Sequence, residues 1–238
     1  MHSVSIVIPA HNEAGNIANL VTEIFEVVPD AMIGEVIVVD DASIDATAAE
    51  IKALQATQPR LRLIRHARKS GQSRAVRSGV EQARFPVIAT LDGDGQNPPA
   101  DIPQLVAAFS FSGPHLVGGH RTKRRDTLSK RWASKAANAI RIAALRDDCP
   151  DTGCGLKVFP RDVYLGLPFF HGQHRYLPAL MRANGCTGLY LPVSDRARSH
   201  GSSNYTNLQR ALVGIFDLVG VAWLLRRARP VTYEEQSS

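Results

Sequence analysis

The chain has 238 residues, of which 44% are hydrophobic and 21% are charged, a composition typical of a folded globular protein rather than a disordered or fibrous one. This length accommodates one domain, or one domain with an appendage, around a sizeable core. The 28 Lys and Arg residues exceed the 22 Asp and Glu residues, so the net charge is +6 and the pI is about 9.5. A basic balance favours anionic partners such as nucleotides, nucleic acid or an acidic membrane surface, although it also serves solubility.

The three cysteines, Cys149, Cys154 and Cys186, form no Cys-x-x-Cys pair. Their odd number and spacing argue against a disulfide framework or a zinc ribbon and fit a reducing compartment. The first residues already have the pattern of a strand, so we expect no signal peptide, and no apolar run reaches the roughly 18 residues needed to span a bilayer. The sequence therefore predicts a cytoplasmic protein that can still contact a membrane surface.

The first half of the chain alternates short apolar runs with segments of helical periodicity. The expected strands are 4–9, 35–40, 61–65 and 86–91, and the expected helices are 12–28, 43–57 and 70–83. Because this alternation produces right-handed βαβ units, we expect an α/β fold with a mainly parallel sheet flanked by helices. Ligands of such sheets bind outside the carboxyl ends of the strands, which is where the pattern puts Pro9, Asp40, Asp41, Asp92 and Asp94.

The second half is less regular. Its expected strands cover 116–119, 155–159 and 189–193, and its expected helices cover 127–145, 173–184 and 208–227. We divide the chain into a main domain over residues 1–205, an amphipathic C-terminal helix over 206–229 and a disordered tail over 230–238.

The C-terminal helix has an apolar stretch, Leu212–Leu225, that contains one carboxylate and is followed by Arg226 and Arg227. It is too short to cross a bilayer. With Trp223 near its end, it fits an amphipathic helix that lies in the membrane interface. A buried core helix or a dimer helix is the alternative.

The sharpest chemical signal is Asp92-Gly93-Asp94-Gly95-Gln96, directly after an apolar strand. Two carboxylates two residues apart and the amide oxygen of Gln96 are the hard ligands that Mg²⁺ or Mn²⁺ prefers. Such an ion would hold a diphosphate and stabilise the charge that develops as it leaves. A surface Asp-Gly turn is the alternative, but the position between a strand and Asn97-Pro98-Pro99 favours the ion site.

The adjacent carboxylates of Asp40 and Asp41 follow another apolar strand. Because neighbouring carboxylates repel each other, we expect at least one of them to bind a ligand. Asp40 is predicted to accept hydrogen bonds from a base or a ribose, or to join the metal shell. Asp45 is predicted to cap the following helix.

A glycine before a predicted helix, Gly71, suits an anion, because the N–H groups of the first helical turn are free to donate. Residues 71–75 also resemble the nucleophile elbow of a serine hydrolase. No Asp and His follow in a convincing order, so a hydrolase is disfavoured. His174 begins a later predicted helix and is assigned no role.

Segments 7–13, 39–47 and 91–99 resemble the family 2 glycosyltransferases with the GT-A (Rossmann-like) fold. Within that family, the chain is most similar to the dolichyl-phosphate mannose synthase group and its bacterial polyprenyl-phosphate glycosyltransferase relatives, from Val4 to about Tyr205. The resemblance implies that Asp92, Asp94 and Gln96 hold Mg²⁺ or Mn²⁺. It also implies a nucleotide site formed by Pro9, Ala10, Glu13, Asp40 and Asp92, beside which we place Asp41 and the Gly71 loop.

Segment 120–135 is strongly basic, and a solvated helix face is the ordinary explanation of such a run. By the resemblance, Arg121 and Arg131 handle an acceptor phosphate, with Ser134 nearby. Segment 196–205 resembles a loop that closes over the donor, and we assign its Arg198 to the pyrophosphate or the acceptor phosphate. Lys157 stands where the family commonly has Arg, so we expect no bidentate phosphate grip there.

The resemblance implies an inverting glycosyltransferase that moves a sugar from a UDP- or GDP-sugar to a polyprenyl phosphate such as undecaprenyl phosphate. The lipid-linked sugar would serve modification of envelope glycans such as lipopolysaccharide. The expected catalytic residues are Asp92, Asp94, Arg121, Arg131 and Arg198. Because a phosphate monoester is mostly dianionic at neutral pH, it needs no side-chain base. We expect peripheral binding to the inner face of the cytoplasmic membrane, with a membrane-protein partner or a second copy of the chain.

Two alternatives remain. One is a family 2 transferase that extends a glycan hydroxyl, with Asp151 or Asp195 as the base. The other is a non-catalytic, sugar-nucleotide-binding partner of a membrane assembly. Nucleic acid is not an expected partner, because the sequence has no recognition-helix motif and carboxylates crowd the predicted ligand edge.

Overall fold

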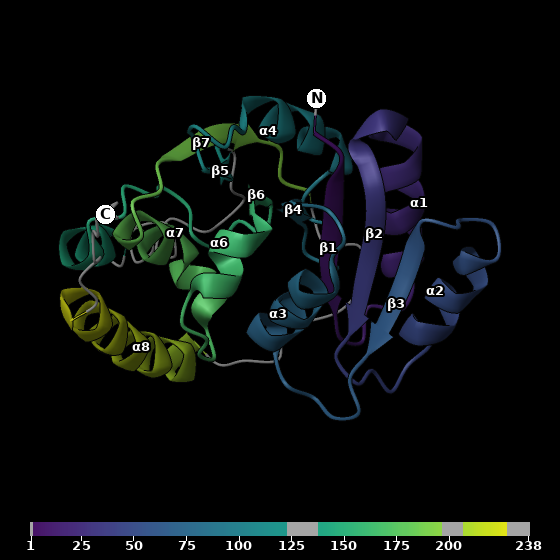
Figure 1. Ribbon diagram of the computed structural model, residues 1–238. Helices are drawn as coiled ribbons and strands as arrows, with labels where there is room; N and C mark the ends of the chain where they lie inside the picture. Colours follow the sequence, from purple (N-terminus) through teal and green to yellow (C-terminus); the bar gives the residue numbers. More distant parts are fainter. Residues whose placement is uncertain (1, 123–137, 197–206, 228–238) are drawn as a thin grey trace, which may run out of the picture.

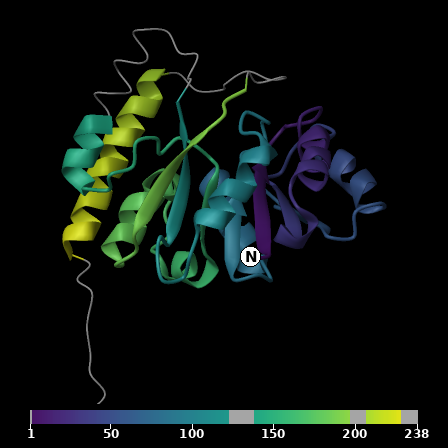
Figure 2. The same cartoon turned by 90° about the horizontal axis from the view of Figure 1, so that it is seen from above.

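The computed structural model describes residues 2–122, 138–196 and 207–227 (Figure 1). These residues form an α/β fold in which a seven-stranded sheet lies between two groups of helices (Figure 2). The expected α/β architecture is confirmed. Arg131, Ser134 and Arg198, and the tail predicted over 230–238, lie outside the described residues.

The strand order is β3-β2-β1-β4-β6-β5-β7. β6 runs antiparallel to both β4 and β5, and every other neighbouring pair is parallel, so the sheet is mainly parallel as predicted. The strands are β1 (Val4–Ala10), β2 (Ile33–Asp40), β3 (Leu61–Arg65), β4 (Val87–Thr90), β5 (Leu116–Arg121), β6 (Lys157–Pro160) and β7 (Gly188–Val193).

Most helices fall where periodicity predicts them. They are α1 (Ile17–Val27), α2 (Thr47–Gln55), α3 (Gln72–Gln82), α4 (Ile102–Ala108), α6 (Arg161–Gly166), α7 (Gln173–Ala183) and α8 (Asn207–Arg227), with 3₁₀ turns η1 (Asp30–Met32) and η2 (Pro99–Asp101). Residues 138–145 are the described part of the expected basic helix. The sequence analysis missed α4 and α6 because helices of seven and six residues are too short to show a clear period.

The first helix starts later than predicted, because residues 12–16 form a loop against the segment after β2. Asn12 has a left-handed φ of 56°, and its N–H donates to Ser43 Oγ. Asp45 accepts from Thr47 N at 3.0 Å and from Ala14 N at 3.1 Å. The N-cap residue of α2 is Ala46 rather than the predicted Asp45, and Asp45, one residue earlier, ties the two loops together.

Alternation along the strands divides the core between the two faces of the sheet. Ile6 and Ile8 of β1 pack with α1, α2 and α4, whereas Val7 packs with α3, α6 and α7. Since both faces are covered by helices, apolar residues fill the strand interiors and the polar side chains gather at the strand ends. That edge carries the candidate site.

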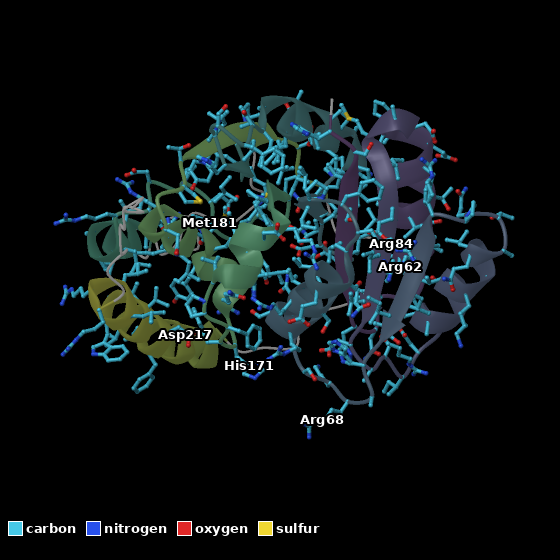
Figure 3. All side chains as sticks on the ribbon, viewed as in Figure 1. Arg62, Arg68, Arg84, His171, Met181 and Asp217 are labelled. Carbon is cyan, nitrogen blue, oxygen red and sulfur yellow. The ribbon has the colours of Figure 1, made fainter. Side chains whose placement is uncertain are left out.

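One face of α8 packs on α7, and the opposite face is exposed. Val221 is buried, the Tyr176 hydroxyl donates to Gly214 O at 3.1 Å, and Asp217 lies beside the start of α7 (Figure 3). The exposed face carries Ile215, Phe216, Val219 and Trp223. The helix is thus amphipathic, and the described part of the chain has no helix that meets the length and apolarity of a membrane span.

We expect Gly79→Ala to destabilise the protein by about 1–3 kcal/mol, because overpacking forces neighbouring atoms apart. Gly79 lies in α3, and an added Cβ would lie 2.4 Å from Val7 Cγ1 and 3.1 Å from Val39 Cγ2. Gly220→Ala is the matched control, since Gly220 is also helical and its added Cβ meets nothing within 4 Å. Urea unfolding should show a loss for Gly79→Ala only; equal shifts in both variants would contradict the packing described.

Candidate functional site

A cleft of about 340 Å³ opens at the carboxyl ends of β1 and β4. Pro9 and Asp92 line it from the parallel part of the sheet. The other side is formed by segments sixty or more residues further along the chain. The residues that line the cleft include Pro9, Gln72, Asp92, Gly155, Lys157, His174 and Arg175.

Asp92 is fixed in the cleft by close packing and by a hydrogen bond. Gln72 Nε2 donates to Asp92 Oδ1 at 2.8 Å. An added Cβ on Gly155 would lie 2.3 Å from Asp92 Cγ, and one on Gly93 would lie 2.9 Å from Pro9 O. Gly155 therefore leaves room for the Asp92 carboxylate, and Gly93 lets the chain after β4 lie against the end of β1.

Asp94 and Gln96 lie on the turn that follows. Gln96 N donates to Asp94 Oδ1 at 3.1 Å, and Gly95 has a φ of 72°, which lets the chain turn sharply. Arg196 N donates to Gln96 O at 2.9 Å, which brings the end of the segment after β7 to this turn.

The donor atoms on this turn fit a hard divalent cation. The described residues contain no group of three or more His, Cys, Asp or Glu side chains placed to hold a metal. Two carboxylates and one amide oxygen instead match the sparse protein ligation of Mg²⁺, which keeps water or substrate phosphate in its remaining positions.

Asp40 ends β2 and is fully buried. Its Oδ1 accepts from Ser43 N at 2.8 Å. Arg65 Nε lies 3.0 Å from Oδ2, close enough for an ion pair, but Oδ2 accepts no hydrogen bond from the described residues. Because the Asp40 side chain has no exposed surface, a base or a ribose can reach Oδ2 only when the half-exposed Arg65 side chain moves away from it.

Asp41 holds the loop that leads to α3. Its carboxylate accepts from Ser70 N and Gly71 N at 2.7 Å each, and His66 Nδ1 lies 2.8 Å away. Burial, the largest single influence, raises the pKa of Asp41, but these hydrogen bonds together outweigh it and hold the pKa below its ordinary value. Within the structure, this expected ligand-binding carboxylate positions Gly71, whose φ is 87°.

The Gly71 loop and the approach to α7 are neighbours. An added Cβ on Gly71 would lie 3.9 Å from His171 Nδ1. His171 and the exposed Arg68 lie at the same lower edge of the molecule in Figure 3. The predicted anion-binding loop therefore borders the second half of the chain.

Ala10 and Glu13 lie where β1 passes into the loop before α1. Ala10 O accepts from Asp41 N at 2.8 Å. Glu13 N donates to Thr47 Oγ1 at 2.8 Å, and Asn16 Nδ2 donates to Glu13 Oε2 at 3.0 Å. Ala10 is thus held beside Asp40 and Asp41, whereas Glu13 is held against Thr47 at the start of α2.

Arg121 forms a bidentate ion pair with Asp151. The distances are 2.8 Å from Nε to Oδ2 and 3.0 Å from Nη2 to Oδ1, and both side chains are largely buried. Burial lowers the pKa of Arg121, but the bonds and charge of Asp151 outweigh it and raise the pKa. Asp151 is therefore occupied by a cation and is poorly suited to act as a base.

Lys157 and Asp195 are two other residues of this region that the sequence singles out. Lys157 donates to the backbone oxygens of Cys154 and Thr152, so it shapes the loop rather than presenting a bidentate grip. Asp195, the other base considered, has Oδ1 buried and without a hydrogen bond to the described residues.

The sequence analysis missed a contact between Ser73 and His174. Ser73 Oγ lies 2.6 Å from His174 Nδ1, across a separation of 101 residues. The expectation that no Asp and His follow Ser73 in a convincing order did not foresee this histidine partner. The hydrolase is still disfavoured, because Ser73 is buried and its oxygen already accepts from Gly172 N and His174 N.

Two curated relatives have names that combine a polyprenyl phosphate with a sugar. The chain is 33% identical to dodecaprenyl-phosphate galacturonate synthase of Rhizobium johnstonii, over 95% of this chain and 69% of the relative. It is 32% identical to undecaprenyl-phosphate 4-deoxy-4-formamido-L-arabinose transferase of Pseudomonas fluorescens, over 92% of this chain and 64% of the relative. The chain thus spans about two thirds of the length of these relatives.

Solved structures with the same fold include glucosyl-3-phosphoglycerate synthase from Mycobacterium tuberculosis. Its complex with UDP has a TM-score of 0.68 and 20% identity, over 93% of this chain and 80% of that one. Its complex with Mg²⁺ and UDP has a TM-score of 0.69 and 19% identity, over 97% and 81%. At this identity the likeness establishes the GT-A fold.

A model of glycosyl transferase family 2 matches residues 5–167. This match covers Asp40, Asp92, Asp94 and Arg121, and the relatives extend the similarity to nearly the whole chain. The chain belongs to glycosyl transferase family 2.

Proposed function

We propose that the protein transfers a sugar from a nucleotide-sugar donor to a polyprenyl phosphate, with inversion at the anomeric carbon. The observation that carries the proposal is the cleft at the strand ends, where Gly155 and Gln72 fix the Asp92 carboxylate. The names of the two relatives, both transferases or synthases of polyprenyl-phosphate sugars, support the choice of acceptor.

In this proposal the nucleotide lies along the ends of β1 and β2. Asp40 Oδ2 accepts from its base or ribose, and Pro9, Ala10 and Glu13 form the adjoining wall. Asp41 acts indirectly, by holding Gly71 and the start of α3 toward the site. The N-terminus of α3 favours the negative charge of the diphosphate.

Asp92, Asp94 and Gln96 would hold Mg²⁺ or Mn²⁺ in this site. The ion would neutralise the leaving diphosphate. The chain's own contribution is to keep the two carboxylates in place. Gln72 Nε2 donates a hydrogen bond to Asp92, and the Gln96 N–H donates one to Asp94. The structures of the M. tuberculosis relative with Mg²⁺ or Mn²⁺ support this assignment.

We place the acceptor on the side of the cleft that is formed by the second half of the chain. Its phosphate is already dianionic at neutral pH and attacks the anomeric carbon without a protein base. Positively charged side chains align the acceptor phosphate with the donor diphosphate and lower the repulsion between these two anions. We assign this task to Arg131 and Arg198, with Arg175 at the cleft and with Arg121 held in a fixed orientation by Asp151.

This arrangement favours phosphate over a glycan hydroxyl as the nucleophile. A hydroxyl acceptor requires a base, and the Asp151 carboxylate is engaged by both Nε and Nη2 of Arg121. Asp195 is the base that a hydroxyl acceptor would have to use, so Asp195→Asn separates the two acceptors: phosphate transfer should survive this change, and hydroxyl transfer should not.

We further propose that α8 binds the membrane surface from which the lipid is drawn. Phe216 and Trp223 on its outer face are 77% and 61% exposed, and Arg226 and Arg227 end the helix. An apolar face followed by cations fits the interface of an anionic bilayer. This surface would present the acceptor phosphate near the cleft.

We expect Asp94→Ala to abolish transfer of labelled sugar to undecaprenyl phosphate, with a loss of at least about 100-fold, because leaving-group stabilisation is removed. EDTA should have the same effect on the unchanged protein. Thermal unfolding should stay near that of the unchanged protein. Asp162→Ala is the control, since Asp162 is an exposed carboxylate on α6. Full activity of Asp94→Ala would remove Asp94 from the site.

For the membrane surface, we expect Phe216→Ser combined with Trp223→Ser to weaken binding to vesicles containing anionic phospholipid by at least about tenfold. Ile44→Ser is the matched control, because Ile44 is also exposed but lies before α2. Flotation with vesicles measures the bound fraction. Equal binding by both variants would contradict a role for α8.

A further inference from the structure

Two helix starts meet at the cleft through Ser73 and His174. Ser73 is the second residue of α3, and His174 is the second residue of α7. Ser73 is buried, and its Oγ lies 2.6 Å from His174 Nδ1. The mechanism proposed above uses neither side chain, although His174 lines the cleft.

The contacts of Ser73 determine which ring nitrogen of His174 carries the proton. Ser73 Oγ accepts from Gly172 N at 3.0 Å and from His174 N at 3.4 Å. A hydroxyl oxygen has two lone pairs and one hydrogen. Since both lone pairs are used, the hydroxyl hydrogen points to Nδ1, and Nδ1 must be the unprotonated nitrogen.

His174 is also neutral. Burial, followed by the positive charges of Arg175 and Lys157, lowers the pKa of His174 to about 3. A neutral imidazole with an unprotonated Nδ1 carries its hydrogen on Nε2. Within the described residues, Nε2 makes no hydrogen bond, so the ring lines the cleft with an unused donor.

We propose that His174 donates a hydrogen bond from Nε2 to a hydroxyl oxygen of the donor sugar, and that it thereby positions the sugar and contributes to its selection. This inference rests on the proposed function. An uncharged donor suits a hydroxyl oxygen, whereas a phosphate is better served by cations and metal. The cleft has the size of a small-ligand site and reaches the aromatic side chains of Phe159 and Tyr164.

Two substitutions separate the Nδ1 and Nε2 functions. In His174→Asn, the amide oxygen can accept from Ser73, but the side chain is too short to donate in the cleft. In His174→Gln, the amide nitrogen reaches the position of Nε2. Asn therefore removes the proposed sugar contact, and Gln restores it.

The test is the Kd of each variant for a nucleotide sugar and for the matching nucleoside diphosphate, measured by calorimetry with Mn²⁺. The probe is the UDP- or GDP-sugar that the unchanged protein binds most tightly. We expect His174→Asn to weaken binding of the nucleotide sugar by about 3- to 10-fold, the value of one neutral hydrogen bond. Its Kd for the diphosphate should not change, and His174→Gln should regain most of the loss.

If His174→Asn binds the nucleotide sugar as tightly as the unchanged protein, the role of His174 is overturned. An equal loss of affinity for the nucleoside diphosphate would overturn it as well. Either result would leave the proposed function standing. If the unchanged protein binds no nucleotide sugar, the proposed function fails together with this inference. Sugar binding with no transfer to undecaprenyl phosphate would remove the acceptor and leave the role of His174 standing.

A second measurement does not depend on either variant folding. Long-range ¹H–¹⁵N spectra of the unchanged protein at about pH 7 should show His174 as the Nε2–H tautomer. Addition of the nucleotide sugar should shift the Nε2 resonance, and addition of the diphosphate should not. A proton on Nδ1, or identical shifts with both ligands, would contradict the proposal.

Discussion

The close approach of Gly155 to Asp92 joins the two halves of the chain around one cleft. Asp92 follows a parallel strand of the first half, and Gly155 precedes β6, which pairs antiparallel with the strand before Asp92. A side chain at residue 155 would have its Cβ 2.3 Å from the carboxylate carbon. The site depends on this contact, because it places the segment before β6 against the strand end that carries Asp92.

The carboxylates at this edge have different tasks. Asp92 and Asp94 each accept a hydrogen bond at the strand end where we propose the divalent cation, whereas the Asp41 carboxylate accepts from two backbone N–H groups and lies 2.8 Å from His66. Asp151 is likewise engaged by Arg121. Sequence alone gives each of these residues the same negative charge, and only the local donors separate a ligand-binding carboxylate from a structural one.

The sheet and most helices could be predicted because apolar periodicity and polar strand ends are local patterns. The positions of Asp40, Asp92 and Asp94 at the carboxyl-end edge of the sheet follow from its parallel topology. The bond between Ser73 and His174 could not be predicted, because nothing local links residues 101 positions apart. The Arg121–Asp151 pair was missed for the same reason, although both residues had been considered separately.

The most direct test of the account is to compare undecaprenyl phosphate with undecaprenol as acceptors of labelled sugar from a panel of UDP- and GDP-sugars. The two lipids differ only in the phosphate that we assign as the nucleophile. The account predicts labelled lipid from undecaprenyl phosphate and none from undecaprenol. Transfer to undecaprenol or to a glycan hydroxyl, with none to undecaprenyl phosphate, would contradict it.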